Sequence, residues 1–295
     1  MTTLQDQIRT KARELLESKQ VDCVIGYGAG SRGQVRPLFV REPAEVERLM
    51  WSPGCTHNLV TYLHDKRKPA KKGAAPPRVA VVVKPCDSRA LNVLIAENQI
   101  GRTRVFVIGV TCEGVAAGAG FAPGENTQTK LQARCERCAE RTPVVSDTLI
   151  GEATPVNASD DFGDVAKLEA LPPAERVAFW LKQYDRCIRC YACRQVCPGC
   201  YCTTCMFERD DSTWVGIATG VKEKEFFHLG RAYHLAARCV GCNECERVCP
   251  MELPLSLLNR KLAKEVRELF NYRAGLEPVQ APLLTMLAEG EEALI

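Results

Sequence analysis

The stretch Arg186-Cys-Ile-Arg-Cys-Tyr-Ala-Cys-Arg-Gln-Val-Cys-Pro198 contains four cysteines in a spacing that returns once more in the chain. The second copy is Arg238-Cys-Val-Gly-Cys-Asn-Glu-Cys-Glu-Arg-Val-Cys-Pro250. Both copies read Cys-x-x-Cys-x-x-Cys-x-x-x-Cys-Pro. Two cysteine runs of one kind therefore indicate two metal sites of one kind.

This spacing is that of bacterial two-cluster ferredoxins, in which three close cysteines hold three corners of a 4Fe–4S cube and the fourth ligates the other cluster. The first cluster is then assigned to Cys187, Cys190, Cys193 and Cys249. The second cluster is assigned to Cys239, Cys242, Cys245 and Cys197. Crossed ligation of this kind ties the two runs together in space.

A pair of structural zinc sites is the alternative interpretation, because a Cys-x-x-Cys pair also binds zinc. Zinc needs four ligands arranged as two pairs. Each run here instead has a third cysteine after two more residues and a fourth that precedes proline. Because both deviations occur twice, iron–sulfur sites are favoured over a non-redox zinc scaffold.

The bulk composition indicates a globular protein of about two domains, with 295 residues, 46% of them hydrophobic and 25% charged. No apolar run approaches the ~20 residues that span a bilayer, and the first residues lack the layout of a signal peptide. The 17 cysteines therefore indicate thiolates for metal in a reducing cytoplasm of an anaerobic or low-oxygen cell. A net charge of +3 is too small to indicate binding of nucleic acid.

The first part of the chain predicts an α/β domain. An apolar stripe over residues 3–18 indicates a helix, and residues 21–25 and 36–40 indicate strands. The glycine-rich segment 26–33 between them lacks the helix that must follow in a dinucleotide-binding fingerprint. It is either a hairpin loop or a place where backbone amides approach a phosphate or a flavin. In the second case the cofactor-binding residues are Gly28, Gly30, Arg32, Gly33 and Arg36.

Two further apolar runs, over residues 78–83 and 104–110, predict strands buried on both faces. The helix between them should run to Asn98, with Asp87 or Ser88 as its cap. Such a β–α–β unit is expected to be parallel and right-handed. The domain is therefore expected to contain a parallel sheet.

Four cysteines of this α/β domain are candidates for a third cluster. Cys86 and Cys112 follow the carboxyl ends of neighbouring strands, where open α/β sheets bind ligands. A Cys-x-x-Cys pair comes next in the chain, so the candidate ligands are Cys86, Cys112, Cys135 and Cys138. The alternative is one or two buried structural cysteines together with a redox pair.

The sequence turns polar over residues 151–171, and we place the domain boundary there. The prediction is an α/β domain over residues 1–152, an α+β two-cluster ferredoxin-like domain over 153–275, and a C-terminal docking arm over 276–295. The second domain should contain helices over residues 172–184 and 223–237. The latter helix brings His228, Arg231 and His234 to one face, where packing and hydrogen bonding near the second cluster are expected.

Three more cysteines directly follow the first run. Cys200, Cys202 and Cys205 exceed what two clusters need. They either hold a fourth cluster together with Cys55, which lies in a Pro-Gly-Cys loop, or form a shielding or redox-active group without metal.

Several motifs together resemble the beta subunit family of the deazaflavin-reducing hydrogenases and formate dehydrogenases. They are Lys84-Pro-Cys-Asp-Ser-Arg-Ala90, Ile108-Gly-Val-Thr-Cys112, Cys135-Glu-Arg-Cys138 and Val145-Ser-Asp-Thr-Leu-Ile-Gly151. The resemblance implies a 4Fe–4S cluster on the same four cysteines of the α/β domain, FAD, hydride exchange with a soluble carrier, and membership of a larger complex. The cysteines at 200–205 resemble instead the iron–sulfur subunits of heterodisulfide-reductase-like complexes.

The expected function is that of an electron-transfer subunit of a cytoplasmic oxidoreductase complex, which relays electrons through several 4Fe–4S clusters and is not catalytic alone. The partners would be subunits of a hydrogenase, a formate dehydrogenase or a heterodisulfide-reductase-like complex. A self-contained FAD enzyme that exchanges hydride with a soluble carrier is the second hypothesis, and the zinc scaffold is the third.

Overall fold

The computed structural model of the chain describes residues 2–66, 76–117, 130–152, 158–209, 211 and 216–277. The chain divides into two compact units, Met1–Asp160 with Gly275–Gln280 and Asp161–Ala274 with Ala281–Ile295. The division falls inside the polar segment 151–171. From residue 278 onward, the docking arm expected over 276–295 lies outside the described residues.

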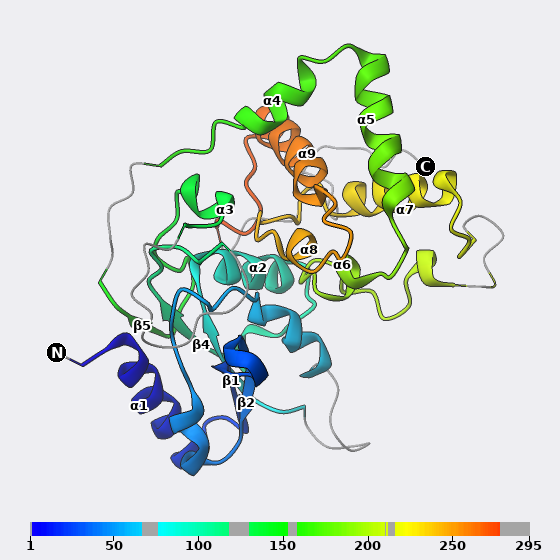
Figure 1. The fold of residues 1–295 in the computed structure, drawn as a ribbon. Helices are drawn as coiled ribbons and strands as arrows, with labels where there is room; N and C mark the ends of the chain where they lie inside the picture. The colour runs from blue at the N-terminus through cyan, green and yellow to red at the C-terminus, as the bar shows by residue number, and fades with distance from the viewer. Residues whose placement is uncertain are drawn as a thin grey trace, which may run out of the picture. The chain divides into compact units, whose positions relative to one another are not determined.

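A five-stranded sheet forms the centre of the first unit, in the order β2-β1-β3-β4-β5 (Figure 1). Its strands are β1 (Cys23–Ala29), β2 (Val35–Val40), β3 (Val79–Val83), β4 (Val105–Val110) and β5 (Thr148–Ile150). The pairs β1–β3, β3–β4 and β4–β5 are parallel, whereas β1 and β2 form an antiparallel hairpin. The expected α/β class with a mainly parallel sheet is confirmed.

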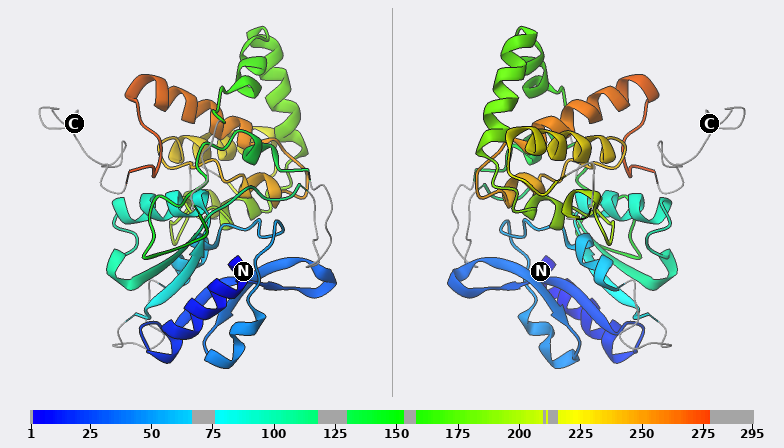
Figure 2. Two further views of the ribbon diagram at one scale, coloured as in Figure 1. Left: turned by 90° about the vertical axis from the view of Figure 1, so that its left-hand side faces the viewer. Right: turned by 90° about the vertical axis from the view of Figure 1, so that its right-hand side faces the viewer.

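Helix α1 (Leu4–Glu17) begins with a capping box, in which the backbone N–H of Asp6 donates to the side chain of Thr3 and the Asp6 carboxylate accepts from Thr3 in return. The helix runs alongside the sheet and contacts β1, β3 and β5 (Figure 2). All five residues of β3 are buried, as its continuous valine-rich sequence predicts for a strand covered on both faces.

Helix α2 (Pro85–Ala96) begins earlier than the sequence predicts. Pro85 stands in the first turn, where its missing N–H costs nothing, and Lys84 occupies the N-cap position. The carboxylate of Asp87 accepts a hydrogen bond from the Lys84 backbone N–H at 3.2 Å. Asp87 therefore caps the helix from its third position, and the expectation that Asp87 or Ser88 is the N-cap residue was wrong.

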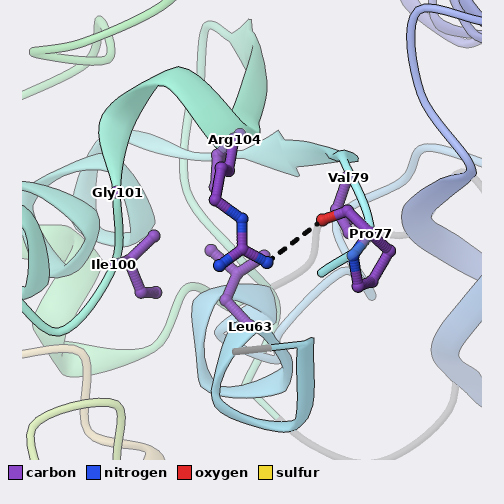
Figure 3. A pocket seen from close by; sticks show the side chains of 7 residues that line it. Leu63, Pro77, Val79, Ile100, Gly101 and Arg104 are labelled. Carbon is purple, nitrogen blue, oxygen red and sulfur yellow. Dashed lines mark hydrogen bonds between the residues drawn. The ribbon is translucent and has the colours of Figure 1, made fainter. Parts of the chain in front are cut away.

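Short helical segments complete the first unit. They are the 3-10 helices η1 (Ser31–Gly33), η2 (Pro43–Arg48), η3 (Leu59–Lys66) and η4 (Arg102–Arg104), and the α-helical turn α3 (Ala133–Glu136). A small pocket of about 260 Å³, which includes open solvent, lies beside η3 and η4 at the amino ends of β3 and β4, with Arg104 donating to the Pro77 carbonyl at 3.3 Å (Figure 3). Parallel sheets bind ligands at the carboxyl ends of their strands, so this pocket lies at the opposite end.

The second unit consists of helices, with no strand in the part of it that the structure describes. An α+β domain was expected there, so the described portion differs from that expectation. The helices are α4 (Gly163–Glu169), α5 (Pro173–Arg186), α6 (Ala192–Gln195), η5 (Met206–Glu208), α7 (Val221–His234), α8 (Glu244–Arg247) and α9 (Leu255–Phe270) (Figure 1). Helix α7 contacts α5 and α9, and α6 contacts α8.

The two cysteine runs share one backbone conformation. In the first run Arg189 and Tyr191 have φ of +51° and +59°, and at the matching positions of the second run Gly241 and Asn243 have φ of +71° and +52°. Each run then enters a one-turn helix, α6 or α8. A left-handed conformation costs a non-glycine residue roughly 1–2 kcal/mol. The same costly backbone path is thus used twice, at cysteine runs of the same spacing.

The chain returns to the first unit after α9. The Asn92 side chain donates to the Gly275 carbonyl at 3.1 Å. Gly275 has φ of +67°, and a Cβ atom there would overlap the backbone of Arg89. Glycine is required at this position both for its conformation and for its small size.

Gly275→Ala should loosen this return segment, because about 1 kcal/mol of conformational strain is joined by about 1–3 kcal/mol of overpacking. Trypsin cleavage after Arg273, measured on the native full chain, should be about tenfold faster or more, since cleavage follows the population of the open form. Gly33→Ala is the matched control, because Gly33 has φ of +70° in the same unit but open space around its Cβ position. Equal cleavage rates in the two variants would contradict the proposed close contact.

Candidate metal centres

The cysteines assigned to the first cluster lie around one pocket of the second unit. Three come from the first run and one from the second, and they are Cys187, Cys190, Cys193 and Cys249. The pocket has about 320 Å³ of empty space, which includes open solvent, and its other walls include Phe227, Leu253 and Leu255. The structure therefore brings the last cysteine of the second run to the first three cysteines of the first run.

Backbone amides point at the sulfur atoms of this pocket. The N–H of Arg189 donates to Cys187 Sγ at 3.3 Å, and the N–H of Leu253 donates to Cys249 Sγ at 3.5 Å. Burial raises the pKa of the Cys193 thiol to about 11. A thiolate is costly in such apolar surroundings unless a bound cation compensates its charge, and metal coordination deprotonates a thiol outright.

The cysteines assigned to the second cluster also lie near one another. Cys245 is buried on α8, and burial raises the pKa of its thiol well above the usual value. The positive charge of Arg231 lowers the pKa of Cys245, whereas the thiols of Cys197, Cys239 and Cys242 raise it further. The Asn259 side chain donates to Cys245 Sγ at 3.7 Å. Here the last cysteine of the first run acts electrostatically on a cysteine of the second run, as do two others of the second run.

Buried side-chain nitrogens without a hydrogen-bond partner in the described part of this unit include Arg189 Nε, His228 Nε2 and Arg231 Nε. Arg189 and His228 both line the first pocket. Burial lowers the pKa of His228 to about 3, so its imidazole is neutral. Buried donors without partners are costly, and a sulfur-rich group in these sites would supply acceptors. The donor set of the second unit therefore fits iron–sulfur clusters.

Among the described residues, no three His, Cys, Asp or Glu side chains are arranged to hold one metal ion. In a 4Fe–4S cluster the four cysteine thiolates bind one cube at its separate corners.

The four candidate ligands of a third cluster lie in the first unit. Cys86 stands in the first turn of α2 just past β3, Cys112 follows β4, Cys135 is in α3, and Cys138 comes two residues after that helix. Burial raises the pKa of the Cys112 thiol, and the nearby Cys135 raises it further. Cys138 is likewise acted on by Cys135, and the Val115 N–H donates to Cys135 Sγ at 3.3 Å. The carboxyl edge of the sheet thus gathers cysteines from separate elements.

Lys84 is a buried cation at this edge to which the sequence assigned no role. Only 1% of its side chain is exposed, and Nζ lies 2.7 Å from the Asp87 carboxylate. Nζ also donates to the His57 carbonyl at 2.8 Å and to the Tyr27 hydroxyl. Burial by itself would lower the pKa of Lys84, but the neighbouring Asp87 raises it above the usual value. The sequence signal was a lysine that directly follows a buried strand and stands two residues before Cys86.

A second buried cation, Arg134, acts electrostatically on Cys86. Arg134 is buried and donates to the Thr56 carbonyl at 3.0 Å. Burial raises the pKa of the Cys86 thiol and Asp87 raises it further, whereas Lys84 and Arg134 both lower it. The pKa of Cys86 is raised overall, and the two cations offset part of that rise.

The additional cysteines differ in their surroundings. Cys200 forms a hydrogen bond with Cys197 that lowers the pKa of the Cys197 thiol to about 6. Cys202 is exposed, and Cys205 packs against the hydrophobic core of the second unit. Cys55 is fully buried in the first unit, where the Ser52 N–H donates to its Sγ at 3.3 Å. A fourth cluster on Cys55, Cys200, Cys202 and Cys205 stays a prediction.

The glycine-rich segment forms the end of the β1–β2 hairpin. A Cβ atom at Gly28 would meet Leu38, and one at Gly30 would meet Arg36. The Arg36 guanidinium donates to the Gln34 side chain at 2.8 Å. Gly33 has open space around it, and Arg32 precedes it in η1. At Gly28 and Gly30 the space is thus occupied by side chains of the hairpin itself, and a flavin site on Gly28, Gly30, Arg32, Gly33 and Arg36 stays a prediction.

None of the helices in the described part of the chain combines the length and apolar character needed to cross a membrane.

Lys84→Met should destabilise the first unit by about 3–5 kcal/mol, because Asp87 would remain as a buried charge without its partner. Lys261→Met is the comparison, since Lys261 is 40% exposed in its ion pair with Glu169 and such pairs contribute about 1 kcal/mol or less. Amide hydrogen exchange of β3 and of α9 measures the two effects separately within the full chain. Similar small losses of protection in both variants would contradict a stabilising buried pair.

Comparisons with known proteins support 4Fe–4S clusters in the segment that contains the two cysteine runs. Residues 183–253, which contain both cysteine runs, match the 4Fe-4S dicluster domain. The chain is 22% identical to the F420-dependent formate dehydrogenase subunit beta of Methanocaldococcus jannaschii, over 92% of each chain. It is 23% identical to the F420-dependent formate dehydrogenase 1 subunit beta of Methanococcus maripaludis, over 70% of this chain and 75% of the relative.

A shorter stretch of the chain is similar to a subunit of a different class of complex. Over 36% of this chain and 11% of the relative, it is 30% identical to the acetyl-CoA decarbonylase/synthase complex subunit alpha 1 of Methanosarcina acetivorans. The longer matches confirm the relationship expected from the sequence motifs: over most of its length this chain is similar to beta subunits of F420-dependent formate dehydrogenases, and its residues 183–253 match a 4Fe–4S dicluster domain.

Proposed function

We propose that this chain is an electron-transfer subunit of an oxidoreductase complex and that its second unit holds two 4Fe–4S clusters with crossed ligands. The observation that carries the proposal is the position of Cys249, which lines one pocket with Cys187, Cys190 and Cys193 although about sixty residues separate it from them in the chain. A crossed pair of clusters places the two sites next to each other. When bound, each cluster gains and loses one electron at a time.

The residues of the second unit support this role by holding, shielding and polarising the sites. The backbone N–H groups of Arg189 and Leu253 donate to ligand sulfurs, and such hydrogen bonds are among the factors that set a cluster potential. Phe227 and Leu255 close the first pocket with apolar surface, which restricts water. Cys190 is exposed, so the first site reaches the surface at this ligand.

We include a third cluster on Cys86, Cys112, Cys135 and Cys138 in the proposal. Its support is the position of Cys86 and Cys112 at the carboxyl edge of the sheet, together with the positive charges of Lys84 and Arg134 beside Cys86. Buried cations of this kind offset the negative charge of thiolates. The two units would then both carry redox centres.

The partner that we propose is the catalytic subunit of a formate dehydrogenase-like complex, since the longest similarities are to beta subunits of formate dehydrogenases. The other candidate partners are subunits of a hydrogenase or of a heterodisulfide-reductase-like complex. Identification of the subunits that co-purify with the chain would distinguish these from a formate dehydrogenase. We place this complex in the cytoplasm, because cysteine thiolates for metal persist in reducing compartments.

A second candidate function is a self-contained FAD enzyme that exchanges hydride with a soluble carrier. The observation in its favour is the similarity over 92% of the chain to a protein named as an F420-dependent formate dehydrogenase subunit. Gly28 and Gly30 do not support it, since hairpin side chains fill the space beside them. Anaerobic purification of the full chain with flavin extraction separates the candidates, because stoichiometric FAD is expected only for the second.

Crossed ligation predicts which pairs of substitutions act on one cluster. Cys187→Ala with Cys249→Ala should remove about four irons per chain, because both residues serve the first cluster. Cys187→Ala with Cys197→Ala, both in the first run, should remove about eight irons, because these residues serve different clusters. Iron and acid-labile sulfide are measured after anaerobic purification. Equal losses, or the reverse order, would contradict the crossed assignment.

The third cluster predicts about twelve irons per chain in the unaltered protein, at four per cluster. Cys112→Ala should lower this by about four and leave the two clusters of the second unit in place. Cys23→Ala is the matched control, because Cys23 is a buried cysteine on β1 of the same unit outside the candidate ligands. A content of about eight irons, unchanged by Cys112→Ala, would restrict the clusters to the second unit, and about sixteen would support a fourth.

A further inference from the structure

The side chain of Arg231 on α7 lies in the interior of the second unit. It is 5% exposed, and its Nη2 donates to the Cys193 carbonyl at 3.0 Å. Its Nε is buried and has no hydrogen-bond acceptor. A guanidinium has five N–H donors and keeps its charge in proteins, so this position holds a permanent positive charge in the core.

The groups around Arg231 belong to both sets of cysteines. Cys193 lines the first pocket, whereas Cys197 and Cys245 belong to the second set. The thiols that act electrostatically on the guanidinium are those of Cys200, Cys197, Cys245 and Cys193. Arg231 therefore contacts both sets directly: it donates to the carbonyl of Cys193, a ligand residue of the first site, and forms a side-chain hydrogen bond with Cys197, a ligand of the second.

Other buried arginines of this unit have carboxylate or multiple carbonyl partners. Arg260 pairs with Asp164 at 2.8 Å, and Arg194 pairs with Glu208 at 3.2 Å. Arg189 donates to the carbonyls of Phe207, Gly216 and Ala218. For Arg231, in the part of the chain that the structure describes, the groups that favour its charged form are cysteines.

A buried charge without a compensating partner is strongly unfavourable. Thiolates that ligate a cluster supply negative charge on both sides of Arg231. The net charge and the hydrogen bonds around a cluster are among the factors that set its reduction potential, and a fixed charge acts strongly where water is excluded. A cation in this position lowers the cost of adding an electron on either side.

We propose that Arg231 is a shared positioning residue that supplies one fixed positive charge to both clusters of the second unit and thereby raises the reduction potentials of both. This inference rests on the proposed cluster sites. It assigns the setting of the two potentials to one side chain of α7, outside both cysteine runs. Both reduction potentials thus depend on the charge of a single residue.

The test measures midpoint potentials by EPR-monitored redox titration of the anaerobically purified full chain, together with its iron content. Arg231→Gln should shift both potentials of the second unit to more negative values. Arg231→Lys keeps a positive charge, so both potentials should stay close to those of the unaltered chain. Arg260→Gln is the matched control, because Arg260 is a buried arginine of the same unit whose charge is paired with Asp164, and it should leave both potentials unchanged.

The outcomes separate this inference from the proposed function. An unaltered chain without iron would overturn the cluster sites themselves. A chain with both clusters, whose potentials do not move in Arg231→Gln or move for one cluster alone, would overturn the shared role of Arg231. If Arg231→Gln loses iron, Arg231→Lys decides: retention of both clusters supports a requirement for the charge. Loss in both variants, with Arg260→Gln intact, would show a role in shape alone and overturn the inference.

Discussion

The exchange of one cysteine between the two runs is the constraint on which the second unit depends. Cys249 lies with the cysteines of the first run, and Cys197 acts on Cys245 of the second. The sulfur-bearing side chains of Cys187, Cys193 and Cys245 are members of the hydrophobic core, together with Phe207 and Phe227. Several ligands are therefore also core residues, and because burial raises the pKa of thiols such as Cys193 and Cys245, a loss of metal would leave neutral buried thiols in place of metal-bound thiolates.

Residue spacing allowed the geometry of the second unit to be predicted because both runs follow one ligand pattern. The left-handed residues Arg189 and Tyr191 and their counterparts in the second run follow a path that this spacing imposes. The sheet of the first unit was predictable from the continuous valine-rich run of β3, since two-sided burial leaves a strong signal in the sequence. The repeated cysteine runs and the uninterrupted apolar strand could thus be predicted from the sequence.

Contacts between distant segments were not predictable in the same way. The ion pair of Lys84 with Asp87 is local, but its burial depends on Tyr27 and on the His57 carbonyl, which only the folded sheet brings near. The glycine-rich segment allowed either a ligand loop or a hairpin, and the choice depended on the pairing of β1 with β2. The contacts of Arg231 with Cys193 and Cys197 were likewise not predictable, because helical periodicity gives the face on which a residue lies but not its neighbour.

The return of the chain at Gly275 makes the first unit discontinuous, since residues from both sides of the second unit contribute to it. Domains generally fold as units during synthesis, beginning at the N-terminus. Here the hydrogen bond of Asn92 to Gly275 forms only after the entire cysteine-rich segment has left the ribosome. Completion of the first unit thus comes after synthesis of residues 161–274, which ties the maturation of the α/β sheet to the segment that carries both cysteine runs.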